Sequence, residues 1–181
     1  MGFVDDLIEQ AEHLAKRDDS KPKQANLRRA VSTAYYALFH ELCEQAVTTV
    51  ASTGSTASLL RARLRRSIDH AQVRQAADWF KDPGKGKLKQ HAPALDDVRQ
   101  QPGSPLQVEL SQVAEKFIEL REARHHADYD FSKAIPRDEA KRLISDANSA
   151  VRALRGLDKS DEDRRLFLLA CLLGSRLNKR N

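Results

Sequence analysis

The chain has 181 residues, a formal net charge of +5, 40% hydrophobic residues and only 6% aromatic residues. Its two cysteines exclude a disulfide framework, and its longest apolar run, Leu166 to Leu173, is too short to span a membrane. The N-terminus lacks the basic and apolar regions of a secretory signal. We therefore expect a reduced, cytoplasmic protein that has no membrane partner and is long enough for one domain with a substantial core.

Apolar residues recur at spacings of three and four along most of the chain, and this periodicity predicts six helices. They cover residues 3–17, 23–50, 59–80, 106–131 and 137–157 and a last segment that opens at 160–163. The sequence leaves open whether the helix at 59–80 is broken near Ser67 and Ile68. Residues 82–105 hold four of the six prolines and three of the seven glycines, which predicts a long loop that is either functional or disordered.

These elements predict an all-α helical bundle of about six helices. Residues 1–157 form the expected helical domain, with a basic loop containing proline and glycine at 82–105. Residues 158–181 form a C-terminal helix that is hydrophobic on all sides between Leu166 and Leu173. Such a helix must be buried, either on the domain's own core or on a second copy of the chain.

The helix predicted at 106–131 has an apolar stripe that becomes polar near its end. The stripe consists of Leu110, Val113, Ala114, Phe117 and Ile118. Its continuation at helical spacing consists of Arg121, Arg124, His125 and Asp128. Because charged groups are rarely buried without a partner, these residues line either a paired polar core or a cleft. The alternative is a helix end that runs into water with an ordinary ion pair between Arg124 and Asp128.

Basic residues concentrate between Ala57 and His91, where nine Lys or Arg residues oppose three aspartates. This segment therefore carries +6 and the rest of the chain −1. A localised basic block is typical of a protein that binds a polyanion, nucleic acid first. The candidate nucleic-acid-binding residues are Arg61, Arg63, Arg65, Arg66, Lys85, Lys87 and Lys89. The alternative is a solvated helix face followed by a solubilising loop.

The arginines and histidines at 121–126 are suited to one chemistry in particular. Arginine stays charged and binds phosphate, whereas histidine titrates near neutrality and moves protons. Together they favour RNA cleavage without a metal, in which a ribose 2′-hydroxyl attacks its own phosphate. A metal site at His125, His126, Asp128 and Asp130 is disfavoured because adjacent helical residues point about 100° apart. Nothing beside Cys43 or Cys171 indicates an activated nucleophile.

Two segments resemble the HEPN superfamily, the nucleotide-binding domains of higher eukaryotes and prokaryotes. Residues 27–40 read Leu-Arg-Arg-Ala-Val-Ser-Thr-Ala-Tyr-Tyr-Ala-Leu-Phe-His, and residues 124–130 read Arg-His-His-Ala-Asp-Tyr-Asp. The resemblance implies a small helical bundle that is usually dimeric. Its active members are metal-independent ribonucleases of toxin–antitoxin and phage-defence systems. They carry an arginine, four to six residues and a histidine, with two copies facing each other.

Two registers of this motif stay open. Arg121 with His126 has the required spacing, although Glu122 stands where the family commonly has Asn, Asp or His. The other register begins at Arg124 and His125 and places Tyr129 where the histidine should be, which makes the motif degenerate. Arg121 and His125 are helical neighbours, whereas Arg121 and His126 point apart unless the helix loosens before Asp128.

The leading prediction is a homodimeric endoribonuclease without cofactor or metal. Arg121 and Arg124 bind phosphate, and His126 or His125 carries the proton. The supporting residues are Asp128, Tyr129, Tyr36 and His40. Its partners would be RNA or a nucleotide and an antitoxin protein. The alternatives are a non-catalytic HEPN module that binds a nucleotide, RNA or a protein, and a plain helical interaction protein.

The second predicted helix carries Arg29, Tyr36 and His40 on a face that its main apolar stripe does not use. We expect Tyr36 and His40 to approach the helix at 106–131, because a buried tyrosine hydroxyl usually finds a partner. The alternative is an ordinary packing tyrosine.

Overall fold

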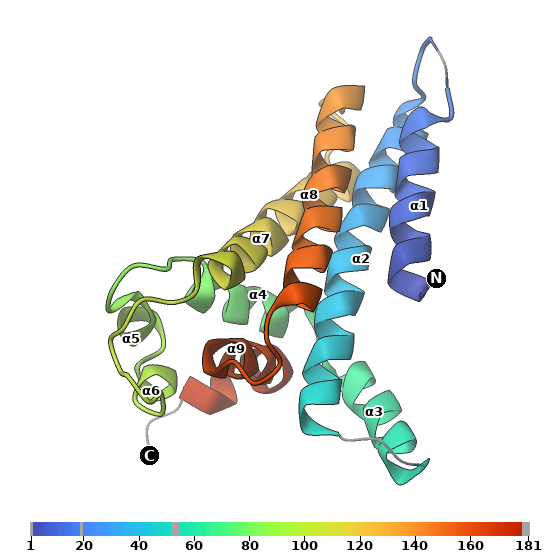
Figure 1. Cartoon of the computed structure of the whole chain (residues 1–181). Coiled ribbons are helices and arrows are strands. Elements are labelled where there is room, and N and C mark those ends of the chain that lie inside the picture. Colours follow the sequence, from blue (N-terminus) through green and yellow to red (C-terminus); the bar gives the residue numbers. More distant parts are fainter. Residues whose placement is uncertain (1, 19, 52–54, 179–181) are drawn as a thin grey trace. The chain divides into compact units, whose positions relative to one another are not determined.

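The structure is a computed structural model that describes residues 2–18, 20–51 and 55–178 (Figure 1). These residues form nine α-helices, one short 3₁₀-helix and no strand, so the fold class is all-α. The helices are α1 (Phe3–Lys16), α2 (Gln24–Val50), α3 (Ser55–Ser67), α4 (His70–Phe80), α5 (Lys87–His91), α6 (Pro93–Asp96), α7 (Val108–Tyr129), α8 (Arg137–Gly156) and α9 (Glu162–Leu173), followed by η1 (Gly174–Asn178). None of the described helices is both long and apolar enough to cross a membrane.

The chain forms two compact units, each built from two separate segments. Unit 1 contains residues 1–40 and 116–152, and unit 2 contains residues 41–115 and 153–181. Unit 1 thus holds α1, the first part of α2, most of α7 and most of α8. Unit 2 holds the end of α2, helices α3 to α6, the start of α7, α9 and η1.

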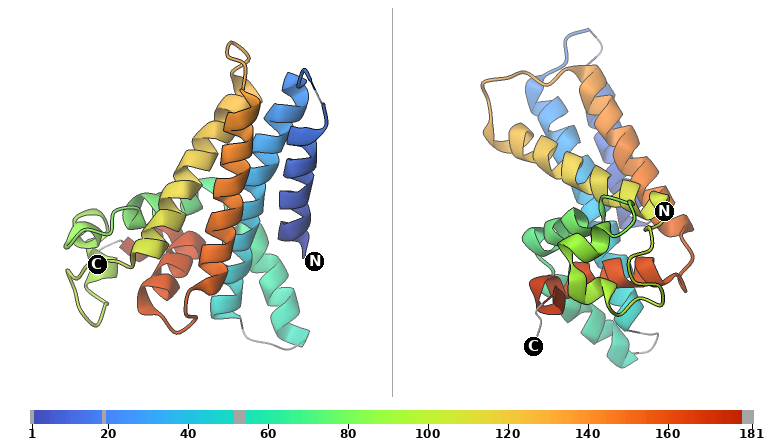
Figure 2. Two further views of the ribbon diagram at one scale, coloured as in Figure 1. Left: turned by 45° about the horizontal axis from the view of Figure 1, so that its top comes forward. Right: turned by 90° about the vertical axis from the view of Figure 1, so that its left-hand side faces the viewer.

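Unit 1 is a helical bundle in which α1, α2 and α8 run side by side (Figures 1 and 2). Helix α1 buries one stripe, Val4, Ile8, Ala11 and Ala15, as its spacing predicts. The centre of the unit is aromatic, with the rings of Tyr35 and Phe117 5.5 Å apart and both side chains almost fully buried. Phe117 belongs to the predicted apolar stripe of α7, in which Ile118 is half-buried.

Unit 2 has its core between α4 and α9, where the rings of Phe80 and Phe167 are 5.3 Å apart. Helix α9 buries Phe167, Leu168 and Cys171 within the chain itself. The third predicted helix is divided in two, because Asp69 begins α4. The Asp69 carboxylate accepts the backbone N–H of Gln72 at 2.8 Å, and the Gln72 side chain accepts the N–H of Asp69 in return.

The predicted loop at 82–105 contains the two short helices α5 and α6, so the prediction of one irregular stretch was wrong. The prolines and glycines begin these helices instead of preventing them. Pro93 occupies the first turn of α6, where a missing N–H costs no hydrogen bond. Gly86, at φ 72°, precedes α5 in a conformation that favours glycine. The helix count rises from the predicted six to nine for these reasons and because of the break at Asp69.

Arg99 holds the rest of this segment to α9. Its side chain is only 4% exposed and donates to both carboxylate oxygens of Asp163, at 2.8 and 3.0 Å. It also donates to Asp96 at 3.0 Å and to the carbonyl of Ser104 at 2.9 Å. A buried arginine with two carboxylates has its charge fully compensated, so Arg99 fixes this segment in place.

Candidate functional site

The polar end of α7 is divided among three flanks because the helix continues unbroken through Tyr129. At about 100° per residue, Arg124 and Asp128 lie on the flank toward α2. Arg121, His125 and Tyr129 form the next flank, which faces solvent more. His126 and Asp130 form a third flank, on the other side of the helix. The helix does not loosen before Asp128, which was the condition for Arg121 and His126 to act together, so these two side chains point apart.

Four side chains from α2 and α7 form a row inside unit 1 that is joined by two hydrogen bonds and one ion pair. The Ser32 hydroxyl donates to Asp128 Oδ1 at 2.5 Å, and Arg124 Nε lies 2.7 Å from Asp128 Oδ2. Arg124 Nη2 then donates to the Tyr36 hydroxyl at 3.2 Å. Ser32 and Tyr36 are four residues apart on one helix and Arg124 and Asp128 four apart on the other, so the two pairs face each other.

This row holds Arg124 as a charged, oriented side chain. Partial burial opposes its charge, but the neighbouring Tyr36 and Asp128 outweigh burial and raise the pKa of the guanidinium. The guanidinium carbon lies 5.8 Å from the centre of the Tyr36 ring and 5.6 Å from that of Tyr129. The structure thus brings Tyr36 against α7, as the shared polar face of the second helix predicts.

Arg121 and His125 lie beside this row and are much less constrained. Arg121 is half-buried and makes no hydrogen bond or ion pair with any residue that the structure describes. His125 is exposed, with its ring 5.1 Å from that of Tyr129, which is itself 64% exposed. Arg29 of α2 is also exposed and shares the flank of Tyr36. We call Arg29, Tyr36, Arg121, Arg124, His125 and Tyr129 the tyrosine–arginine face.

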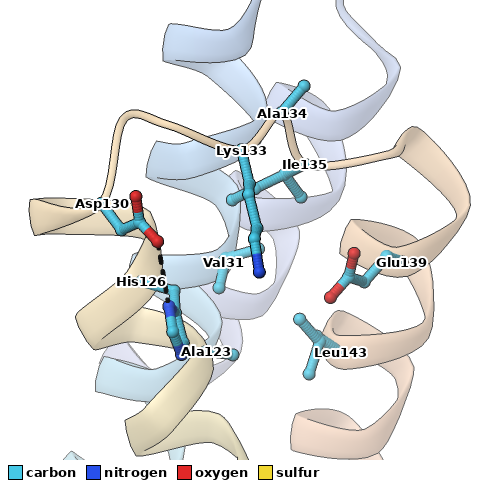
Figure 3. Close-up of a pocket in the computed structure, with 9 residues that line it drawn as sticks. All are labelled: Val31, Ala123, His126, Asp130, Lys133, Ala134, Ile135, Glu139 and Leu143. Atoms are coloured by element: carbon cyan, nitrogen blue, oxygen red, sulfur yellow. Dashed lines mark ion pairs between the residues drawn. The ribbon is translucent and has the colours of Figure 1, made fainter.

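His126 lines a different feature, a pocket of about 250 Å³ between α2, α7 and α8 (Figure 3). Its Nδ1 lies 3.6 Å from the carboxylate of Asp130, an ion pair only when the histidine is protonated. Figure 3 shows the Lys133 amine between His126 and Glu139, above an apolar floor that includes Val31 and Leu143. The two histidines of the predicted motif therefore lie in different surroundings: His125 on the tyrosine–arginine face and His126 in this pocket.

His40 lies near Tyr36 but its ring contacts are with α1 and α2. The centre of its ring is 5.2 Å from that of Phe3 and 6.3 Å from that of Tyr36. The side chain is half-buried, and this burial lowers the pKa of the imidazole. His40 therefore packs against Phe3 and Tyr36. Contrary to the prediction, it makes no ring contact or hydrogen bond with α7 among the described residues.

Arg28 is the residue of this region that sequence reasoning missed. Its guanidinium donates to the carbonyls of His126, Ala127 and Asp130, at 3.2, 3.0 and 2.8 Å, and to that of Lys133 at 2.6 Å. These include last-turn carbonyls of α7, which have no partner within the helix. Arg28 thus fixes the end of α7 and the turn beyond it. The signal was present, since Arg28 stands four residues before Ser32 in the segment that resembles HEPN proteins.

The predicted basic block forms two patches and not one. Arg61, Arg63, Arg65 and Arg66 lie on α3, whereas Lys85, Lys87 and Lys89 lie in or just before α5. Helices α3 and α5 lie on opposite sides of α9 (Figures 1 and 2, left). Arg65 pairs with Glu44 and Lys87 with Asp82, so part of the positive charge is compensated.

Comparison with known proteins identifies no relative of this chain. The chain matches no family model, no curated protein and no solved structure.

Proposed function

We propose that the chain is a HEPN-like protein that binds single-stranded RNA on the tyrosine–arginine face and cleaves it without a metal ion. The observation that carries this proposal is the position of Arg121, one helical turn from the exposed His125 and beside Arg124. Arg121 has no ion pair among the described residues, whereas Arg124 is held by Asp128. Phosphate recognition and proton transfer need these two kinds of side chain at adjoining positions.

The four residues that α7 contributes to the face have distinct tasks in this mechanism. Arg121 and Arg124 bind the phosphate and stabilise the negative charge that develops when the 2′-hydroxyl attacks. His125 takes up or donates the proton, and Tyr129 offers a ring on which a base can stack. Asp128 positions Arg124 from behind and touches no substrate. The face therefore favours His125 over His126 as the proton carrier.

The proposed site is a composite of two chains. Cleavage by the 2′-hydroxyl uses a base for attack and an acid for the leaving oxygen. Within the described residues, each chain offers one histidine on this face, so a second copy related by a two-fold axis would supply the other. The patches on α3 and α5 would add phosphate contacts that weaken as salt rises.

The test is incubation of single-stranded RNA with the purified full-length chain in the presence of EDTA. We expect fragments that end in 2′,3′-cyclic phosphate, while DNA of the same sequence stays intact because it has no 2′-hydroxyl. Arg121→Ala and His125→Ala should abolish cleavage and keep the helical circular dichroism spectrum. Arg152→Ala, which changes an exposed arginine of unit 1 outside the face, is the matched control and should cleave normally.

Two results would contradict parts of this proposal. Cleavage that depends on His126 and not on His125 would move the site to the other flank of α7. Intact RNA after prolonged incubation with folded dimer would remove the catalytic function altogether.

A second function, RNA binding without cleavage, is favoured by one specific observation. Arg121 and His126, the pair with the spacing of active HEPN members, point to different flanks of an unbroken helix. A binder would retain RNA affinity that falls steeply with salt. In that case Arg121→Ala would weaken binding, and His125→Ala would leave both binding and RNA integrity unchanged.

A further inference from the structure

Unit 2 contains a buried arginine whose charge is not compensated. Arg164, in the first turn of α9, is 3% exposed. Its Nη2 donates to Gln45 Oε1 at 2.7 Å, and its Nε is buried without any hydrogen-bond partner among the described residues. No carboxylate of residues 2–18, 20–51 or 55–178 lies within ion-pair distance of its guanidinium. Burial consequently lowers its pKa, against weaker opposing effects of Asp161 and Asp158.

Comparison with Arg99 shows how unusual this arrangement is. Both arginines are buried in the same unit, but Arg99 has two carboxylates and two backbone carbonyls as partners. A buried cation without a counter-ion is costly, and proteins rarely leave one uncompensated. Arg164 therefore has no counter-ion among the residues that the structure describes.

Arg164 lines a cavity of about 480 Å³, which we call the α9 cavity. Lys159 and Arg165 also line it, and both are exposed and free of ion pairs to described residues. The end of α2 supplies the remaining wall, through Glu44, Gln45, Thr48 and Thr49. The lining of the α9 cavity therefore contains three cationic side chains and one carboxylate, that of Glu44.

The nearby carboxylates are already occupied. Glu44 pairs with Arg65 at 2.5 Å. Asp161 accepts the backbone N–H of Arg164 at 2.8 Å, where it caps α9, and the Gln107 side chain at 2.7 Å. Asp158 accepts the N–H and hydroxyl of Ser160. The cations of the α9 cavity are thus left for an external anion.

We propose that the α9 cavity binds the phosphate group of a small molecule, with Arg164 at its base and Lys159 and Arg165 at its rim. Arginine binds phosphate oxygens through its planar fork, and lysine adds a mobile point charge. Three cations suit a doubly charged phosphate better than a single carboxylate. The volume is in the range of pockets that hold small organic ligands, so a nucleoside monophosphate fits as well as free phosphate. This site is independent of the tyrosine–arginine face.

The test is titration of the full-length chain by calorimetry at constant ionic strength with inorganic phosphate and with AMP. We expect saturable binding that Arg164→Met weakens tenfold or more, the loss of a charge-assisted hydrogen bond of about 1.5–3 kcal/mol. Replacing a buried, unpaired cation by an apolar side chain of similar size should not impair folding. Tighter binding of AMP than of phosphate would identify a nucleoside phosphate, and equal binding the phosphate group alone.

Three further variants serve as controls in this titration. Arg17→Gln changes an exposed arginine of unit 1 and should leave phosphate binding unchanged. If Arg164→Met does not fold, the surface double variant Lys159→Gln/Arg165→Gln should still weaken binding. Absence of saturable binding in the unmodified chain, or equal binding by the folded variants, would overturn the proposal. Arg121→Ala should not affect phosphate binding here, so failure of one proposal does not decide the other.

Discussion

Each carboxylate oxygen of Asp128 has its own partner, one neutral and one charged, and this arrangement fixes the orientation of Arg124. The Ser32 hydroxyl occupies one oxygen and the Arg124 guanidinium the other. Arg124 is therefore positioned by a single carboxylate, and its Nη2 donates to the Tyr36 hydroxyl. An arginine held in this way is oriented for an incoming phosphate at little further entropic cost.

At the residue scale, the Tyr36 hydroxyl offers a direct test of this row. Tyr36→Phe should lower the free energy of unfolding by about 1 kcal/mol, because the half-buried Arg124 loses a hydrogen-bond acceptor. Tyr129→Phe removes the same atom from an exposed tyrosine whose hydroxyl has no partner in the described residues. Its effect should stay within about 0.5 kcal/mol in the same urea titration. Equal effects would show that the hydrogen bond contributes nothing.

His40 gives a prediction for pH dependence. Its folded-state pKa lies below the ordinary value of 6.5 because burial disfavours the charged form. The unfolded state therefore binds more protons, and stability falls as the pH drops through about 6.5 toward the folded-state pKa. His40→Phe, which keeps a ring against Phe3, should flatten the stability profile between about pH 7.5 and 5.5. An NMR titration midpoint for the His40 ring at or above 6.5 would contradict this assignment.

At the scale of elements, periodicity predicted the long helices well and the segment between α4 and α7 poorly. The stripes of α1 and α7 repeat at three and four residues because each helix packs one face on a core. Arg99 could not be recognised, since its partner Asp163 is 64 residues away and only tertiary structure brings them together. Arg28 was missed although its segment was singled out, because its acceptors are backbone carbonyls about 100 residues away, which no side-chain pattern identifies.

The buried Arg99 cluster should dominate the stability of this segment. Arg99→Met leaves Asp96 and Asp163 buried without their cation and should cost about 3–5 kcal/mol of unfolding free energy. Arg142→Met, which breaks ion pairs of an arginine that is 52% exposed, should cost less than about 1 kcal/mol. Urea unfolding of the two variants provides the comparison. Similar losses would mean that burial adds nothing to the Arg99 pairs.

For the whole molecule, the sequence predicted the helical class and the position of the polar face, but left open whether Arg121 and His126 would point apart. The outcome depends on whether α7 stays helical to Tyr129, and Arg28 of α2 stabilises this helix end through its hydrogen bonds to the carbonyls there. The two histidines are adjacent in sequence, so only the backbone geometry separates their surroundings. The basic block was likewise continuous in sequence and became two patches once α4 and α9 formed the core of unit 2.

The cysteines report on unit 2 as a whole. Burial raises the pKa of the Cys43 thiol to about 12, and burial also raises that of Cys171. The folded chain should therefore resist thiol reagents at pH 8, whereas both thiols should react in denaturant. The rate in native conditions should follow the opening of unit 2. A thiol that reacts immediately in the folded chain would show that its surroundings are open.

The contacts of Arg28 have a consequence for evolution. An arginine that donates to four carbonyls, at the end of α7 and in the segment after it, contributes to stability whether or not RNA is cleaved. Homologues would therefore keep it even after losing activity, and its presence would say nothing about catalysis. Arg121 has no structural task among the described residues, so a homologue that only binds could lose it without losing stability. We therefore expect Arg121 to be kept in homologues that cleave RNA and to vary in those that only bind it, whereas Arg28 should be kept in both groups.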